Sequence, residues 1–189
     1  MKEILIATNN SGKVKEIEEI LSEYKLLTLK DLDLKIEVKE DGKTFEENSL
    51  KKAKEISEKT NLPCIADDSG LCIDALDGFP GVYTARYIGG EKTKKKRNLE
   101  LIEKLKDKEN KTARFICVVT FYYKGKKKIE KGEIIGKIAD YPRGENGFGF
   151  DEIFELENGK TLAELSLEEK NKISSRKIAL NKLKKDLNF

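Results

Sequence analysis

Histidine is absent from this 189-residue sequence. That absence excludes catalytic triads and dyads built on histidine, histidine general bases and histidine metal ligands. Any hydrolysis that the chain performs must therefore depend on carboxylates, lysine, arginine and a hard metal ion such as magnesium.

Cysteine and long apolar runs are also scarce. The three cysteines, Cys64, Cys72 and Cys117, are odd in number and show no Cys-x-x-Cys spacing. This argues against a disulfide framework or a zinc site and indicates a reducing compartment. The N-terminus does not read as a signal peptide, and no apolar run approaches the roughly 20 residues of a membrane span. We therefore expect a cytoplasmic protein with no membrane partner.

Neither sign of charge is in large excess, because 38 basic residues face 35 acidic ones and the net charge is +3. A dedicated nucleic-acid binder usually has a lopsided balance, so we expect no nucleic-acid partner. We interpret the densest basic run, residues 92–97, as a solvated helix face. The abundance of lysine and glutamate fits a heat-adapted protein and a compositional bias of the genome equally well.

The composition is that of a folded, heavily charged protein, with 38% hydrophobic and 39% charged residues and three prolines. The sequence contains no internal repeat, low-complexity tract or separable linker. We expect one domain over residues 1–189, with two lobes that share a core.

The hydrophobic pattern alternates between strand and helix periods. It predicts strands over residues 2–8, 34–39 and 64–66, a long hairpin formed by residues 112–123 and 127–138, and helices after residue 12, up to residue 60, over 93–107 and from 166 onward. Capping boxes at Thr44/Glu47 and Ser166/Glu169 open two of the helices. The final helix presents Ile173 on one face with Leu180, Leu183 and Leu187. Together these elements indicate an α/β fold with a mixed sheet.

A polar segment that could bind phosphate follows the first strand. Its backbone N–H groups, the helix dipole and the charge of Lys13 favour an anion. The segment is not a P-loop, because Val14 follows Gly12-Lys13 and the earlier glycine is missing. A simple helix cap explains it about as well. Its residues are Thr8, Asn9, Asn10, Ser11, Gly12 and Lys13.

Two adjacent carboxylates, Asp67 and Asp68, end the strand predicted over residues 64–66. Buried carboxylates are costly unless they are paired or bind a cation. They suit magnesium, which bridges substrate phosphates, and one of them could deprotonate an attacking water. The alternative is a polar turn with an aspartate cap.

Further acidic residues gather near the second helix start, at positions 37, 40, 41, 46 and 47. One of them could complete a metal site, although capping or solvation explains most of them.

Two C-terminal segments could contact a nucleobase. The glycine-rich stretch 144–151 includes Phe148 and Phe150, and an aromatic ring there could stack on a base; for Phe150 we favour core packing. Lys170 and Arg176 are donor-only groups that would donate to a 6-keto oxygen and disfavour the 6-amino group of adenine, which is itself a donor. On its own, this pattern is also that of a charged amphipathic helix.

Taken in order along the chain, these motifs resemble the inosine triphosphate pyrophosphatase family. The matching segments cover nearly the whole chain, and their combined specificity is high. They are ATNNSGK (7–13), EDGKTFEENSLKKA (40–53), IADDSGLCIDAL (65–76), GFPGVYTARY (78–87), GENGFGFDEIF (144–154) and TLAELSLEEKNKISSR (161–176).

The resemblance implies an enzyme that hydrolyses ITP, dITP and XTP to the monophosphate and pyrophosphate and so cleanses the nucleotide pool. It implies a two-lobed α/β fold with an elongated mixed sheet flanked by helices, an active-site cleft between the lobes, and a homodimer. Asp68 would bind Mg²⁺ (with Mn²⁺ as an alternative) and act as the general base for water attacking the α-phosphorus. Glu40 is the nearest second metal ligand, with Asp67 and Glu37 as alternatives.

The resemblance also assigns the substrate contacts. The segment from Thr8 to Lys13, together with Lys52 and Ser69, would hold the triphosphate. Phe148 would stack on the base. The base pocket would be framed by Phe148, Gly149, Phe150, Asp151, Lys170, Ser175 and Arg176.

Two positions depart from the family pattern. Ser175 stands where the family has a base-contacting histidine, and a hydroxyl has a shorter reach and no charge. Lys39 stands where the family often has a glutamate, and for that reason Glu40 is only the nearest substitute.

Three other readings compete with this one. A related nucleotide pyrophosphatase family, known for modified pyrimidines and septum inhibition, is thought to share the fold, but its serine-rich, double-arginine N-terminal motif is not seen here. A nucleotide or RNA sensor that binds without cutting is the second, and metal-dependent pyrophosphate release would exclude it. A purely structural protein would leave the Asp67-Asp68 pair unexplained.

Overall fold

The computed structural model describes residues 2–185 and 187. Its strands are β1 (Glu3–Ile6), β2 (Lys25–Thr28), β3 (Cys64–Ile73), β4 (Thr112–Tyr123), β5 (Lys126–Ile138) and β6 (Phe154–Glu155). Its α-helices are α1 (Ser11–Ile20), α2 (Phe45–Thr60), α3 (Thr84–Ile88), α4 (Lys94–Lys104), α5 (Leu167–Lys172) and α6 (Ser175–Lys185). Three short 3₁₀ helices are η1 (Asp74–Leu76), η2 (Gly81–Tyr83) and η3 (Leu162–Glu164).

The strands form one sheet of six, in the order β2-β1-β3-β4-β5-β6. Strand β1 pairs in parallel with β2 and β3, whereas β5 pairs antiparallel with β6. The turn between β4 and β5 has positive φ at both Lys124 (47°) and Gly125 (81°), as tight hairpins require. The α/β fold with a mixed sheet and the long hairpin are thus confirmed.

The chain divides into two compact units. Unit 1 is Met1–Asp68, Cys117–Gly132 and Ser175–Phe189, and unit 2 is Ser69–Ile116 and Glu133–Ser174. Strands β3, β4 and β5 contribute residues to both units, so the chain passes from one to the other within these three strands and again between Ser174 and Ser175, at the start of α6.

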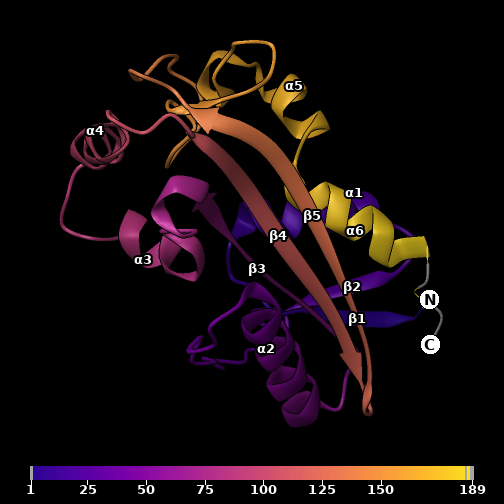
Figure 1. Ribbon diagram of the computed structural model, residues 1–189. Coiled ribbons are helices and arrows are strands. Elements are labelled where there is room, and N and C mark those ends of the chain that lie inside the picture. Colours follow the sequence, from indigo (N-terminus) through magenta and orange to yellow (C-terminus); the bar gives the residue numbers. More distant parts are fainter. Residues whose placement is uncertain (1, 186, 188–189) are drawn as a thin grey trace. The chain divides into compact units, whose positions relative to one another are not determined.

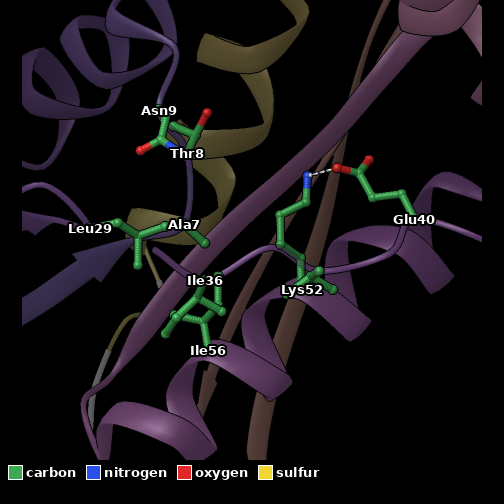
Figure 2. Close-up of a pocket in the computed structure, with 9 residues that line it drawn as sticks. Ala7, Thr8, Asn9, Leu29, Ile36, Glu40, Lys52 and Ile56 are labelled. Carbon is green, nitrogen blue, oxygen red and sulfur yellow. Dashed lines mark ion pairs between the residues drawn. The ribbon is translucent and has the colours of Figure 1, made fainter. Parts of the chain in front are cut away.

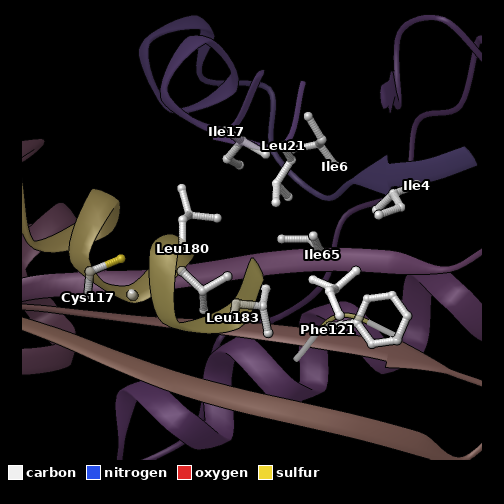
Figure 3. Packing of buried hydrophobic residues seen from close by; sticks show 12 residues of the cluster. Ile4, Ile6, Ile17, Leu21, Ile65, Cys117, Phe121, Leu180 and Leu183 are labelled. Atoms are coloured by element: carbon white, nitrogen blue, oxygen red, sulfur yellow. The ribbon is translucent and has the colours of Figure 1, made fainter. Parts of the chain in front are cut away.

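Unit 1 has helices on both faces of its strands (Figure 1). Successive strand residues point to opposite faces. Ile4 and Ile6 of β1 therefore pack with α1 and α6, while Leu5 and Ala7 pack with α2. Figure 3 shows the first of these clusters, in which Leu180 and Leu183 of α6 face the strands.

Unit 2 has its own core. Leu71 and Ile73 of β3 are buried with Leu101 of α4, and Phe150 and Phe154 belong to the same cluster. Each unit therefore buries an apolar cluster that can hold its own polar loops in place.

The prediction of a strand over residues 34–39 is wrong, because this segment pairs with no other strand in the described chain. Its alternating apolar residues Leu34, Ile36 and Val38 pack against the α2-side cluster of unit 1. One-sided packing thus produces the same alternation as strand pairing. The short strands β2 and β6 were not predicted.

The strand that was predicted to end at Ala66 continues to Ile73, so Asp67 and Asp68 lie within β3 and not in a turn. The prediction of a single final helix is also wrong, because α5 ends at Lys172 and α6 begins at Ser175. Ile173 packs in the core of unit 2, whereas Leu180 packs in that of unit 1, so these residues do not share one face.

Two predicted caps were tested by the structure. The capping box at Ser166 and Glu169 is confirmed. At Thr44 the hydroxyl accepts from the N–H of Glu47 (3.1 Å), but the Glu47 carboxylate accepts from Lys43 (2.6 Å) and does not close the box. In the part of the chain described here, no helix is long and apolar enough to cross a membrane.

Gly132 of β5 lies against the start of α6. A Cβ atom at this position would be 1.9 Å from the carbonyl oxygen of Ser175 and 2.7 Å from the amide nitrogen of Ala179. We expect Gly132→Ala to lower the free energy of unfolding by about 1–3 kcal/mol, since an overpacked backbone contact cannot relax without shifting the helix. Urea titration measures this. Gly90→Ala is the matched control, because a Cβ atom there would lie 3.6 Å from the nearest backbone oxygens, those of Arg86 and Tyr87. Equal stability of the two variants would contradict the close approach.

Candidate functional site

The phosphate-binding candidate of unit 1 is the N-terminus of α1. Asn10 caps the helix, and its side-chain oxygen accepts from the N–H groups of Gly12 (2.9 Å) and Lys13 (3.3 Å). The Thr8 hydroxyl accepts from the N–H of Asn10 (3.2 Å). Asn9 and Ser11 are exposed. The cap reading of this segment is therefore confirmed, and its exposed side chains are available to an anion.

Asp67 is the centre of a buried ion-pair network. Its carboxylate lies 2.9 Å from the Lys13 ammonium group and 3.1 Å from Nε of Arg176, and it is 2% exposed. Arg176 also contacts Glu16 at 3.2 Å. The network therefore joins the start of α1, strand β3 and the start of α6.

Burial alone would raise the pKa of Asp67, but the charges of Lys13, Arg176 and Lys52 outweigh it and lower the pKa below its usual range. Burial likewise disfavours the charged form of Arg176, yet the Asp67 carboxylate raises the pKa of that guanidinium. Asp67 is thus held ionised by its partners.

Asp68 points to the opposite face of β3, toward α2. One of its oxygens accepts from Nδ2 of Asn48 at 2.9 Å. The other end of the Asn48 amide accepts from the N–H of Gly42 at 2.8 Å, and Asn48 is 1% exposed. Because both ends of the amide are used, its orientation is fixed and it presents a donor to Asp68.

Lys52 connects Glu40, one of the candidate metal ligands, to strand β3. Its ammonium group donates to the backbone carbonyl of Asp67 (2.9 Å) and pairs with Glu40 (2.8 Å). Figure 2 shows this pair at the edge of a pocket of about 170 Å³, where Thr8 and Asn9 also lie. The apolar lining comes from Ala7, Leu29, Ile36, Val38 and Ile56.

The three cysteines form no disulfide with one another. Burial raises the pKa of the Cys64 and Cys117 thiols, which makes them unsuited to act as nucleophiles. In the described part of the chain, no group of three or more acidic or cysteine side chains is placed to hold a metal ion.

The base-pocket candidate of unit 2 is the loop between Gly147 and Asp151. The Phe148 ring is 74% exposed, while Phe150 is buried in the core. The Asp151 carboxylate accepts from the N–H of Phe148 (2.8 Å) and pairs with the Lys170 ammonium group. The Lys170 ammonium lies 5.0 Å from the centroid of the Phe148 ring.

The structure therefore brings the predicted site residues together in two sets. The unit 1 set contains the α1 N-terminus, Lys52, Glu40, Asp68 and Arg176; the unit 2 set contains Phe148, Gly149, Asp151 and Lys170. Core packing of Phe150 is confirmed. Ser175 is the half-buried first residue of α6, and half-buried Ser69 follows Asp68 in β3.

Asn48 was not predicted from the sequence as part of the site. It lies on the buried face of α2, beside Ser49, Ala53 and Ile56. A polar amide on a face that is otherwise small or apolar is the feature that could have identified it.

The sequence and the fold match a known class of protein. The profile of the Ham1 family matches residues 4–186. The dITP/XTP pyrophosphatase of Bacillus subtilis is 47% identical, over 98% of this chain and 96% of its own. The protein of the same name from Geobacter sulfurreducens is also 47% identical, over 100% and 98%.

Solved structures agree. The Ham1 protein of Staphylococcus aureus superposes with a TM-score of 0.91 at 41% identity, covering 98% of both chains. That of Coxiella burnetii gives a TM-score of 0.92 at 39% identity, over 99% of this chain and 98% of its own. This chain belongs to the Ham1 family, and the family inferred from the motifs is confirmed.

Removing the charge of Asp67 leaves Lys13 and Arg176 without their buried partner. We expect Asp67→Asn to lower the free energy of unfolding by about 3 kcal/mol at pH 7. The pKa of Asp67 is lowered in the folded state, so its contribution is fully present above the unfolded value of about 3.9 and declines as pH falls below it.

Urea titrations of wild type and variant at pH 7 and pH 3 measure this difference. Glu16→Gln is the control, since it removes only the second partner of Arg176. A wild-type advantage that stays constant down to pH 3 would exclude Asp67 as the source.

Proposed function

We propose that the chain is a nucleoside-triphosphate pyrophosphatase acting on deaminated purine nucleotides such as ITP, dITP and XTP. The observation that supports it most is Asp68. One oxygen of this buried carboxylate accepts from Asn48, and the residue next to it in β3, Asp67, is contacted by the ammonium groups of Lys13 and Lys52. The activity named for the relatives in Bacillus and Geobacter requires such a site.

The triphosphate would bind to the unit 1 set. Lys13 and Lys52 supply positive charge, and the side chains from Thr8 to Ser11 supply hydrogen-bonding groups at a helix N-terminus. Both lysines are paired with carboxylates here. Such pairing holds each ammonium group in place before an anion arrives.

The chemistry of the donor set fits a magnesium ion that enters with its substrate. Magnesium is usually held by one or two carboxylates together with substrate phosphates and water, not by a protein cage. Asp68 and Glu40 would supply those carboxylates, which agrees with the absence of a larger acidic cluster in the described residues. When bound, the ion would neutralise charge on the phosphates. Asp67 is a poor ligand, because its charge is already matched by Lys13 and Arg176.

Asp68 would accept a proton from a water that attacks the α-phosphorus. The bond between the α-phosphorus and the bridging oxygen then breaks, releasing the monophosphate and pyrophosphate. Lys13 and Lys52 would stabilise the negative charge that develops on the leaving pyrophosphate.

The base would stack on the exposed Phe148 ring, with Lys170 as a donor toward a 6-keto oxygen. Lys170 is held near that ring by Asp151. In this proposal Ser69, Ser175 and Arg176 also contact the substrate. The proposed enzyme is a homodimer located in the cytoplasm. Arg176 contacts Asp67, so it would act on the triphosphate side and not on the base.

The first test is pyrophosphate release from ITP, XTP, GTP, ATP and dUTP, with and without magnesium. We expect magnesium-dependent cleavage of ITP and XTP far above ATP, since donors at the base pocket disfavour the 6-amino group. Cleavage of triphosphates that carry other bases would change the proposed substrate class. Binding of nucleotide without any cleavage would favour a sensor.

A second test addresses Asp68. We expect Asp68→Asn to lower kcat by about 10³-fold, because the amide cannot accept the proton from water. Asp41→Asn is the matched control, since Asp41 is exposed and pairs with Lys51. Near-wild-type turnover in Asp68→Asn would remove this residue from the role of base.

A third test addresses Asn48. In Asn48→Asp the acceptor for Gly42 remains, but the donor to Asp68 is replaced by a second carboxylate. We expect kcat to fall roughly 10- to 100-fold, as for other groups that orient a ligand or base. Ser49→Ala is the control, because it removes a neighbouring buried hydrogen bond to Thr120 (2.8 Å) without touching Asp68. Equal kcat in the two variants would reduce Asn48 to a packing role.

A further inference from the structure

A buried amide on α4 reaches the loop that presents Phe148. Asn98 is 0% exposed, and its Nδ2 group donates to the carbonyl oxygen of Gly149 at 3.2 Å. A second, longer contact joins Nδ2 to the Glu152 carboxylate at 3.4 Å. Asn98 thus bonds the residue between the exposed and the buried phenylalanine of the loop.

The loop around Gly149 has little freedom. Gly149 has φ +61°, and a Cβ atom there would lie 3.1 Å from the Ile88 side chain. On one side of it the Phe148 N–H is bonded to Asp151, and on the other the Phe150 ring is buried. The hydrogen bond from Asn98 adds a third contact. Together these three contacts restrain the backbone that carries the Phe148 ring.

The other end of this amide costs stability. The Oδ1 atom of Asn98 is buried and has no hydrogen-bond partner in the described structure. An unsatisfied buried oxygen costs about 1–3 kcal/mol. Fold stability alone would therefore favour an apolar side chain of similar size, such as leucine, at this position.

The surroundings of Phe150 repeat the pattern. The Arg97 guanidinium lies 5.9 Å from its ring centroid, and the Tyr87 ring stacks on it at 6.1 Å. Buried Nε of Arg97 and the Tyr87 hydroxyl also lack partners in the described residues. Several buried polar atoms without hydrogen-bond partners thus lie on the buried side of the loop that exposes Phe148.

We propose that Asn98 is a positioning residue for base recognition: by bonding the Gly149 carbonyl, it fixes the loop that orients Phe148 and Asp151. The proposal rests on the proposed function, in which Phe148 stacks on the purine. It assigns a specificity role to α4, the helix whose first turn contains most of the basic run 92–97.

The test measures the two product halves separately. Binding of inosine monophosphate and of pyrophosphate to the full chain is measured by calorimetry in magnesium buffer. We expect Asn98→Leu to raise the Kd for inosine monophosphate about 10-fold and to leave the Kd for pyrophosphate unchanged, because only unit 2 contacts are altered. The ratio of kcat/KM for ITP over ATP should fall with it.

Asn98→Asp is the second variant, since it keeps size and shape but turns an oxygen toward the Gly149 carbonyl. We expect a similar or larger loss of affinity for inosine monophosphate. Lys94→Gln is the matched control: it lies on the same helix and removes the ion pair to Glu152 without touching Gly149. Its affinity should equal that of the wild type.

Unchanged affinity for inosine monophosphate and an unchanged ITP to ATP ratio in either folded variant would overturn the proposal. Loss of folding in both variants, judged by melting temperature, would assign Asn98 to the fold and overturn it as well. A wild-type protein that neither binds inosine monophosphate nor cleaves ITP would overturn the proposed function itself. These results are distinct, since only the last concerns the unaltered chain.

Discussion

The buried carboxylate of Asp67 is the constraint on which the candidate phosphate site depends. It lies in the middle of strand β3, where an uncompensated charge would be prohibitive. Lys13 comes from the start of α1 and Arg176 from the start of α6, so the ion pairs fix both helix ends against the strand. The lysine expected to meet phosphate is thereby placed by the same interaction that allows the strand to continue.

Adjacent aspartates acquire different roles because a strand sends successive side chains to opposite faces. Asp67 points to the side of α1 and α6, where its carboxylate forms ion pairs with two cationic side chains. Asp68 points to the α2 side, where the Asn48 amide donates to one of its oxygens. In the proposed function, Asp68 is the carboxylate that meets metal and water, whereas Asp67 forms the ion pairs that hold α1 and α6 against the strand.

The sequence was sufficient for the α/β class, the mixed sheet, the hairpin and the family, because these follow from periodicity and ordered motifs. The strand prediction failed for Leu34, Ile36 and Val38, because one-sided packing produces the same alternation as a paired strand. The prediction of one final helix failed because Ile173 and Leu180, which fit one helical spacing, pack in two different cores. For Asn48 the spacing could indicate a polar amide on a buried helix face, but not its partner on β3, because that contact is tertiary. The position of Arg176 beside Asp67 likewise depends on tertiary contacts.

Asn48 and Asn98 share one physical logic. Each is a buried carboxamide that reaches from a helix to a segment whose backbone or carboxylate faces substrate in the proposed function. An amide offers directional hydrogen bonds without adding charge, so it can orient a charged or aromatic group without altering the local electrostatic balance. In a chain with 39% charged residues and no histidine, neutral amides are the groups best able to do this. In the proposed function, charged side chains therefore bind the substrate, and the two uncharged amides orient the groups that meet it.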